Sequence, residues 1–527
     1  MSVNSEAENN QIQEEAQSLA QRGNNRSRQP KNQEFRQYIG EDWGPRPDGP
    51  SRAEVADYTP ARRAGLAALF PGQRLVIPAG DLIARSNDTD FRFRAHSAFA
   101  HLTGLGGEEE PGAVLVLHPL PTPVTPESHA TTPTHEAVLY FHPRASRSSE
   151  EFYADPRHGE FWVGARLSAA DMSTLTGIRV KHIDSLRDDL AKDLGTGTGA
   201  VQLRVMPGAD TQTETLVNQL RTENGLATGQ TARQLDDELA EAASELRLIK
   251  DEWEINEIRK AVAITHDGFA DMIRALPRAT EHWRGERVLE GAFGARAREE
   301  GNGLGYETIV AAGNHANTLH WIKNTGLVRE GELVLIDAGA EVDSLYTADI
   351  TRTLPVSGHF SETQRQVYEA VLDACEAALR KASEKGARFK DVHAAAMEVI
   401  AKHLEEWGIL PVSAGESLQS GSGQYHRRWM PHGTSHHLGI DVHDCAQAKR
   451  ELYTDAVLEP GMVFTIEPGL YFREDDLKVP ERFRGIGVRI EDDIVITEHG
   501  AERISEAIPR TVADVEEWMA QLRNTAQ

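Results

Sequence analysis

The chain has very few cysteines for its length. Only Cys375 and Cys445 occur among 527 residues, and their separation is not that of a metal-binding cysteine pair. So few thiols indicate a reducing compartment rather than a disulfide framework. No run approaches the roughly 20 apolar residues of a membrane span, and the polar start MSVNSEAENNQIQEEAQSLAQ has no secretory pattern. We therefore expect a cytoplasmic protein without a membrane partner.

Positive charge is also scarce. Lys and Arg number 56 against 82 Asp and Glu, which gives a formal net charge of -26. Binding to nucleic acid needs a basic face, so we expect no nucleic-acid partner. Hydrophobic residues make up 39% and charged residues 26%, as in a soluble globular protein. A chain of this length is too long for one small core, and two domains are expected.

The first part of the chain differs in composition from the rest. Residues 1–58 are rich in Gln, Asn, Arg, Glu and Pro, so they cannot bury enough apolar surface to offset their ordering entropy. We expect a mostly disordered extension. The window QEFRQYIGEDW, which carries Phe35, Tyr38 and Trp43, could instead dock loosely onto the body.

Two domains are predicted after this extension. Residues 59–243 contain strand-like runs such as RLVIPAG and AVLVLHP, turns rich in Pro and Gly, and two amphipathic helices. Residues 120–136, LPTPVTPESHATTPTHE, predict a long surface loop. From about residue 244 to residue 527, long helices alternate with short apolar strands, which favours an α+β domain with helices flanking a mostly antiparallel sheet.

Four acidic residues of the second domain stand in or beside short apolar runs. Asp337 lies in LVLIDAG, Asp349 in TADITRT, Glu467 in FTIEPGLYF and Glu491 in GVRIEDDIVI. An ionised carboxylate is rarely buried without a partner, and one or two divalent cations are a common partner. Oxygen-rich ligand sets with one imidazole suit manganese, cobalt or zinc. Two metals sharing carboxylates are a recurring device for amide hydrolysis.

Taken singly, these acids allow plainer interpretations. Asp337 could be a turn aspartate and Asp349 a solvated one, although adjacent strands could bring both to one face. Glu491 follows shortly after Arg489, and a strand glutamate beside a strand arginine is often only an ion pair.

The stretch PHGTSHHLGIDVHD holds His432, His436, His437 and His443. Histidine supplies metal ligation, hydrogen bonds to an oxyanion and proton transfer. We leave His437 out of the candidate site, since a side chain adjacent to that of His436 should point elsewhere. A core or surface histidine patch is the alternative. His320, in TLHWIKN, would be structural if it were taken alone.

Six motifs carry a resemblance to a known family. In the family's order they are TIVAAGNHANTLHW, ELVLIDAGAE, ADITRTLPVSGHFS, MPHGTSHHLGIDVHD, LEPGMVFTIEPGLYF and RGIGVRIEDDIVIT. With them the chain resembles the Xaa-Pro aminopeptidase (aminopeptidase P) family of the pita-bread group, which also holds prolidases, methionine aminopeptidases and creatinases. The resemblance implies a C-terminal pita-bread catalytic domain preceded by a smaller α/β creatinase-type domain. RSNDTDFRFRAHSAFAHLTG and EFWVGARLS resemble that first domain more loosely.

The resemblance implies a two-metal site on Asp337, Asp349, His436, Glu467 and Glu491. Asp349 and Glu491 would bridge both ions. Asp337 would hold one ion, while His436 and Glu467 would complete the other. A hydroxide between the ions would attack the carbonyl of the first substrate residue, with Glu467 handling the proton. Manganese is the implied metal, with cobalt or zinc as alternatives.

Other matching positions would serve the substrate. His443 and His432 would bind the substrate and its tetrahedral oxyanion, and His320 would face the proline side of the scissile bond. Arg489 and Tyr306 would hold the carboxylate of the first metal-binding aspartate in position.

The resemblance also implies a homodimer or homotetramer, in which a neighbouring N-terminal domain lines the active site. The matching positions are Asp88, by the RSND segment, and Trp162, in EFW. His437 departs from the family's pattern, because better-known members often carry an aromatic residue at this position.

The implied reaction is removal of an N-terminal residue when proline follows. Proline has no amide hydrogen and a fixed φ, so peptidases that bind an extended backbone handle it poorly. A prolidase, which cleaves only Xaa-Pro dipeptides with the same metals, is the nearest alternative; the T-S of HGTSHH and the long N-terminal domain favour the aminopeptidase. Creatinases lack this metal set. A non-catalytic pita-bread scaffold would have lost ligand residues, and none is missing here.

Overall fold

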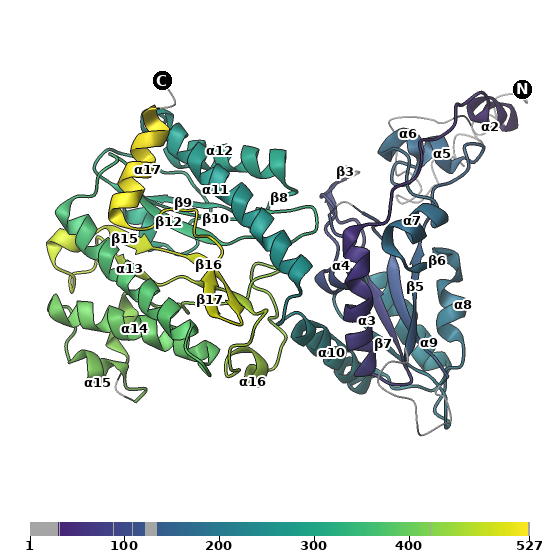
Figure 1. Cartoon of the computed structure of the whole chain (residues 1–527). Coiled ribbons are helices and arrows are strands. Elements are labelled where there is room, and N and C mark those ends of the chain that lie inside the picture. Colours follow the sequence, from purple (N-terminus) through teal and green to yellow (C-terminus); the bar gives the residue numbers. More distant parts are fainter. Residues whose placement is uncertain are drawn as a thin grey trace, which may run out of the picture.

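The computed structural model shows an N-terminal and a C-terminal domain joined by α10 (Gly229–Leu246) and the start of α11 (Glu252–Glu281) (Figure 1). Asp88 and residues 122–133 of the expected surface loop lie outside the described residues. Among the helices of the described part, none combines the length and apolarity that crossing a membrane requires. The described residues are 30, 32–87, 89–107, 109–121, 134–421 and 423–524.

The N-terminal domain is built on one five-stranded mixed sheet in the order β6-β5-β4-β1-β7. The central strands β1 and β4 contain consecutive apolar residues, and because alternate residues point to opposite sides, these strands bury apolar side chains on both faces. Leu75 and Ile77 of β1 pack toward α3 and α4, whereas Val76 packs toward α9. The elements are α3 (Thr59–Ala68), β1 (Gln73–Pro78), α4 (Ser97–Thr103), β4 (Val114–Pro119), β5 (His135–Phe141), β6 (Arg179–His182), α8 (Leu186–Ala191), β7 (Gln202–Val205) and α9 (Thr211–Glu223).

Residues 32–58 lie against this domain. Phe35 of α2 (Gln33–Gly40) packs edge-on to Tyr153 at 5.3 Å between ring centroids, and Trp43 packs against Phe152 at 5.8 Å. A few aromatic side chains thus supply apolar contacts, although the segment is polar on average.

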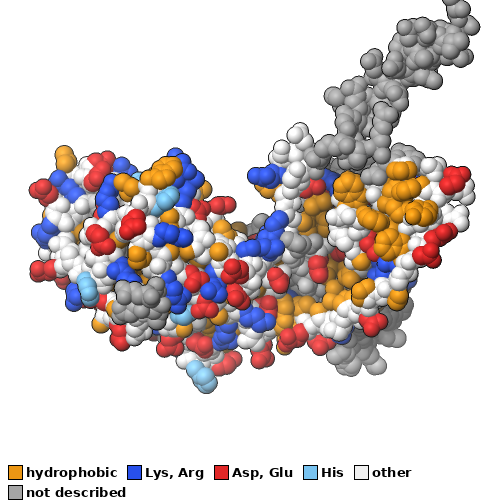
Figure 2. Space-filling model, turned by 90° about the horizontal axis from the view of Figure 1, so that it is seen from above, with side chains coloured by type: hydrophobic (Ala, Val, Ile, Leu, Met, Phe, Trp, Pro, Cys, Tyr) orange, Lys and Arg blue, Asp and Glu red, His pale blue; other side chains and the backbone are white. Residues whose placement is uncertain are grey.

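Figure 2 shows hydrophobic side chains gathered on the N-terminal domain, whereas charges of both signs cover the C-terminal domain in the same view.

The C-terminal domain places short antiparallel sheets between two pairs of helices (Figure 1). Capping boxes define the starts of two of these helices: Asp251 with Glu254 for α11, and Ser361 with Gln364 for α13. The helices are α11, α12 (Gly285–Glu300), α13 (Glu362–Ala382), α14 (Phe389–Glu406) and α17 (Val512–Asn524). The main strands are β9 (Ile309–Ala312), β10 (Leu333–Ala338), β12 (Ile350–Pro355), β13 (Val463–Ile466), β14 (Gly469–Phe472), β15 (Ile486–Arg489), β16 (Asp492–Thr497) and β17 (Gly500–Arg503). This confirms the predicted α+β class.

Polar contacts join the two domains beside the loop that carries His443. Arg94 of the N-terminal domain donates to the carbonyl of Ile440 at 2.7 Å, and Ser97 donates to Asp441 at 2.6 Å. The buried carboxylate of Asp444 accepts from Arg247, in the segment between the domains, at 3.0 Å. Arg94 and Ser97 therefore hold this loop from the N-terminal domain.

Candidate metal centre

Neighbouring strand ends bring the predicted acidic residues together. Strands β10 and β12 pair antiparallel with Asp337 opposite Thr351. Paired residues of neighbouring strands point to the same side of a sheet, and so do residues two apart along one strand. Because Asp349 lies two residues before Thr351, the side chains of Asp337 and Asp349 point to the same side. The amide of Glu491 donates to the carbonyl of Thr351 at 3.1 Å, which sets Glu491 beside the same strand. The adjacent-strand arrangement considered for Asp337 and Asp349 is therefore the one observed.

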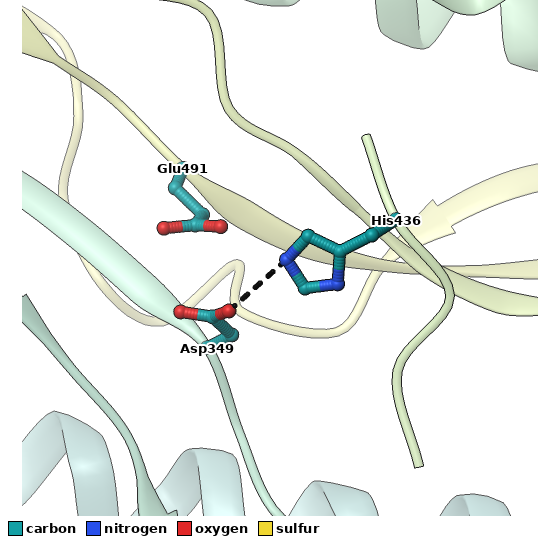
Figure 3. A group of neighbouring side chains, drawn as sticks. All are labelled: Asp349, His436 and Glu491. Atoms are coloured by element: carbon teal, nitrogen blue, oxygen red, sulfur yellow. Dashed lines mark ion pairs between the residues drawn. The ribbon is translucent and has the colours of Figure 1, made fainter. Parts of the chain in front are cut away.

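His436 and Glu467 reach the same point from a second pair of segments. The amide of Thr465 on β13 donates to the carbonyl of His436 at 2.9 Å, and the amide of Glu467 donates to that of Thr434 at 2.8 Å. Figure 3 shows the side chains of Asp349, His436 and Glu491 pointing toward one another. One potential ligand atom from each of these three lies within 4.8 Å of the others.

One nitrogen of His436 faces the carboxylates. Its Nε2 lies 3.2 Å from Asp349 Oδ2 and 3.8 Å from Glu467 Oε1. Its Nδ1 lies 3.2 Å from the carbonyl oxygen of His437, to which it can only donate. This hydrogen bond orients the ring and leaves Nε2 as the nitrogen available for a metal.

Tyr306 and the buried side chain of Arg489 hold Asp337. The hydroxyl of Tyr306 lies 2.6 Å from both Asp337 Oδ1 and Asp349 Oδ1, so its single proton is shared between two carboxylates. Arg489 Nη2 donates to Asp337 Oδ2. The same guanidinium donates to Thr351 Oγ1 and to the Tyr471 hydroxyl, each at 3.1 Å. Asp337 is thereby oriented from two sides.

The acidic residues of the centre carry more negative charge than the positively charged side chains around them neutralise. Burial, reinforced by the charge of Asp349, raises the pKa of Glu491 well above its usual range and raises that of Asp337 as well. Burial also raises the pKa of Glu467 to about 7, although His436 opposes the shift. Burial lowers the pKa of His436, but its hydrogen bond to Asp349 and the charges of Asp349 and Glu467 together outweigh this and raise it to about 9. Such a site lacks positive charge, and oxygen-rich donors with one imidazole fit divalent cations.

The remaining predicted histidines line one cavity of about 580 Å³ together with the acidic residues. His432 lies 2.8 Å from the Tyr471 hydroxyl, and burial together with Arg489 lowers its pKa to about 3. The ring of His443 packs edge-on to that of His436 at 4.4 Å between centroids. His320 contributes to the wall beside the apolar side chains Leu319, Ile322 and Val442.

One predicted residue of the described part, Trp162, does not line this cavity within the chain. Trp162 lies on α6 (Glu160–Val163) of the N-terminal domain, where its Nε1 donates to the carbonyl of Tyr153 at 2.8 Å. Asp88 is outside the described residues. His437, left out of the candidate site, faces away and stacks on Phe389 at 4.6 Å between ring centroids.

Sequence reasoning missed three residues of the centre. Thr351 donates to Glu491 Oε2 at 2.6 Å, and its position two residues after Asp349 on a strand could have indicated it. Asp493, which accepts from the Asp349 amide at 3.1 Å, could have been suspected from the EDD run. Tyr471, which contacts both Arg489 and His432, had no local signal.

Comparisons with known proteins identify the family of both domains. The family model for metallopeptidase family M24 matches residues 256–498, and that for the aminopeptidase P N-terminal domain matches residues 59–201. Xaa-Pro aminopeptidases 1 and 2 of Streptomyces coelicolor are 48% and 45% identical, each over 89% of this chain and 88% and 92% of their own lengths.

Solved structures of Escherichia coli aminopeptidase P are similar throughout. One in a low-pH form is 30% identical with a TM-score of 0.74, covering 90% of this chain and 100% of its own. Another, Zn-substituted and in complex with product, has a TM-score of 0.73 over the same shares. Family membership supports use of divalent metal at the carboxylate centre. This chain therefore belongs to metallopeptidase family M24, as a member that carries an aminopeptidase P N-terminal domain ahead of its pita-bread domain.

Proposed function

We propose that this enzyme is an Xaa-Pro aminopeptidase, which hydrolyses the bond between an N-terminal residue and a following proline. The convergence of Asp349, His436 and Glu491 in a cavity that also holds the other acids and histidines is the observation that carries the proposal. The relatives named Xaa-Pro aminopeptidase support this specificity over that of a prolidase.

We assign two divalent ions, manganese in preference to cobalt or zinc, to the five residues Asp337, Asp349, His436, Glu467 and Glu491. Asp349 and Glu491 would be shared by both ions. Bound ions would supply Lewis acidity for the carbonyl and a nucleophile from water at neutral pH. We assign to Glu467 the uptake and return of the proton of that reaction.

The other residues of the cavity would bind the substrate. We assign His443 and His432 to the substrate and its oxyanion, and His320 to the proline side. We assign to Tyr306 and Arg489 the role of keeping the Asp337 carboxylate from rotating, which their hydrogen bonds to it support. The apolar side chains beside His320 suit the proline ring, which offers no N–H to pair.

The assembly and location are further parts of the proposal. Exposed hydrophobic side chains on the N-terminal domain, with Trp162 at 45% exposure among them, support a homodimer or homotetramer. The low number of cysteines supports a cytoplasmic location. In the oligomer Trp162 and Asp88 would line a neighbouring active site. We keep 59–243 and 244–527 as the two domains, with 1–58 as an extension.

Metal affinity should fall as the pH is lowered. Without metal, the pKa of Glu467 is about 7 and that of His436 about 9, so both hold protons in mildly acidic solution. An ion must displace those protons, so the Kd for Mn²⁺ should rise by about tenfold per pH unit for each proton released below pH 7. Calorimetric titration of the chelator-treated protein in buffers of different ionisation enthalpy would measure both the Kd for Mn²⁺ and the number of protons released. A Kd independent of pH would contradict the proposed ligands.

A panel of three peptides tests the specificity. The manganese-loaded enzyme should release the first residue from Ala-Pro-Phe, and should leave both Ala-Pro and Met-Ala-Ser largely intact. Cleavage of Ala-Pro alone would assign the chain to the prolidases. No cleavage, together with no metal uptake, would instead support a non-catalytic scaffold.

A further inference from the structure

The loop of residues 313–326, which carries His320, closes around one buried carboxylate. Glu286 of α12 is fully buried and lies outside the proposed metal centre. Its Oε1 accepts from the Ala312 amide at 3.0 Å and from His315 Nδ1 at 2.7 Å. Its Oε2 accepts from Trp321 Nε1 at 2.8 Å and from the Gly326 amide. Three donors of the loop and the amide of Ala312, at the end of β9, thus meet at a single side chain.

The loop has little freedom around this carboxylate. The ring of His315 stacks on that of Trp321 at 3.9 Å between centroids. A Cβ on Gly326 would lie 2.6 Å from Glu286 Oε1, so only glycine fits there. The buried side chain of Asn324 also ties the loop to its neighbouring strand, since it accepts from Val310 at 3.0 Å. These contacts leave one shape for the backbone between Ala312 and Gly326.

The backbone conformation of this loop determines the position of one wall of the cavity. Leu319, His320 and Ile322 line the cavity and flank Trp321, whose indole N–H points instead to Glu286. A buried carboxylate that accepts four hydrogen bonds is costly to disturb, because each donor left unpaired loses its hydration without replacement. Such a group specifies a conformation rather than contacting substrate.

We propose that Glu286 is a positioning residue that acts through the 313–326 loop to set His320 against the residue following the scissile bond. This inference rests on the proposed function, in which that residue is proline. Displacement of a positioned group by about 1 Å can cost about 10²-fold in rate, so the effect should be measurable in catalysis.

Glu286→Gln keeps the side-chain volume but turns one acceptor oxygen into an NH₂ group facing hydrogen-bond donors. We expect kcat/KM for Ala-Pro-Phe to fall by about 10²-fold with unchanged metal content. Glu299→Gln, the same change at an exposed position of the same helix, should leave kcat/KM unaltered. Glu286→Gln activity within about twofold of the parent would overturn the proposal.

A double-mutant cycle with His320→Ala separates positioning from general structural support. If Glu286 acts through His320, the variant carrying both changes should lie within about twofold of His320→Ala alone. If the losses in kcat/KM of the two single variants multiply in the double variant, Glu286 acts by another route and the proposal is overturned. Should Glu286→Gln fail to fold, Trp321→Phe removes one of the four donors while keeping a stacking ring, and enters the same cycle. Failure of both to fold would assign Glu286 to folding and also overturn it.

Hydrogen exchange gives a readout independent of cleavage. The amides of Ala312 and Gly326 should exchange faster in Glu286→Gln than in the parent or in Glu299→Gln. If the parent cleaves no Xaa-Pro peptide, the proposed function fails whatever the exchange shows. If the parent cleaves and exchange at both amides is unchanged by Glu286→Gln, the inference alone fails.

Discussion

Replacing Asp349 by asparagine should lower kcat/KM for Ala-Pro-Phe by about 10³-fold or more, equivalent to about 4 kcal/mol of transition-state stabilisation. An amide of the same size keeps one oxygen but loses the charge that would be shared between two ions. The metal-free protein should keep its fold, because the substitution removes one of several crowded negative charges, and its melting temperature should stay within about 4 °C. Steady-state kinetics measures kcat/KM, thermal unfolding measures the melting temperature, and elemental analysis gives the metal content of the variant.

The matched control is Asp373→Asn, on a side chain that is 63% exposed on α13. It should match the parent in metal content and activity. Activity of Asp349→Asn within about tenfold of the parent would contradict a bridging role for this carboxylate. Full loss of activity with full metal content would point to the hydrogen bond between Asp349 and His436 instead.

Glu467→Gln should lower kcat for Ala-Pro-Phe by about 10²-fold to 10⁴-fold, with a smaller effect on KM. Glutamine retains an oxygen for a metal but cannot accept a proton, so the chemical step should suffer more than binding. Single-turnover measurements with the manganese-loaded variant would isolate that step. Glu481→Gln, at an exposed glutamate of the same domain, is the control. A variant that loses metal without any fall in kcat of the loaded fraction would leave Glu467 a ligand only.

Local pattern was sufficient to predict the fold class. The helical spacing of apolar residues after Leu246 corresponds to α11, and the apolar run around Asp337 corresponds to β10. Both signals depend on neighbours a few residues apart, which is the range over which helix and strand periodicities act. The resemblance then supplied the pita-bread arrangement, which the family comparison confirms.

The N-terminal extension shows where averaging over composition is insufficient. Residues 32–58 are polar on average, yet Trp43 lies against Phe152 and Phe161 of the N-terminal domain. These aromatic residues are more than a hundred positions apart in the sequence. Their contact depends on how the domain folds around Phe152 and Phe161, which no short stretch of sequence reveals.

By itself the sequence determined that acids would stand at the ends of buried strands and that histidines would gather in one segment. Only the tertiary structure decided which groups meet them. Arg489 reaches Asp337 across 152 positions, and Glu286 on α12 meets Trp321 in the loop that follows β9. Strand alternation is a local property of the backbone, whereas the pairing of a buried charge is decided by whatever side chain packing brings within hydrogen-bond distance.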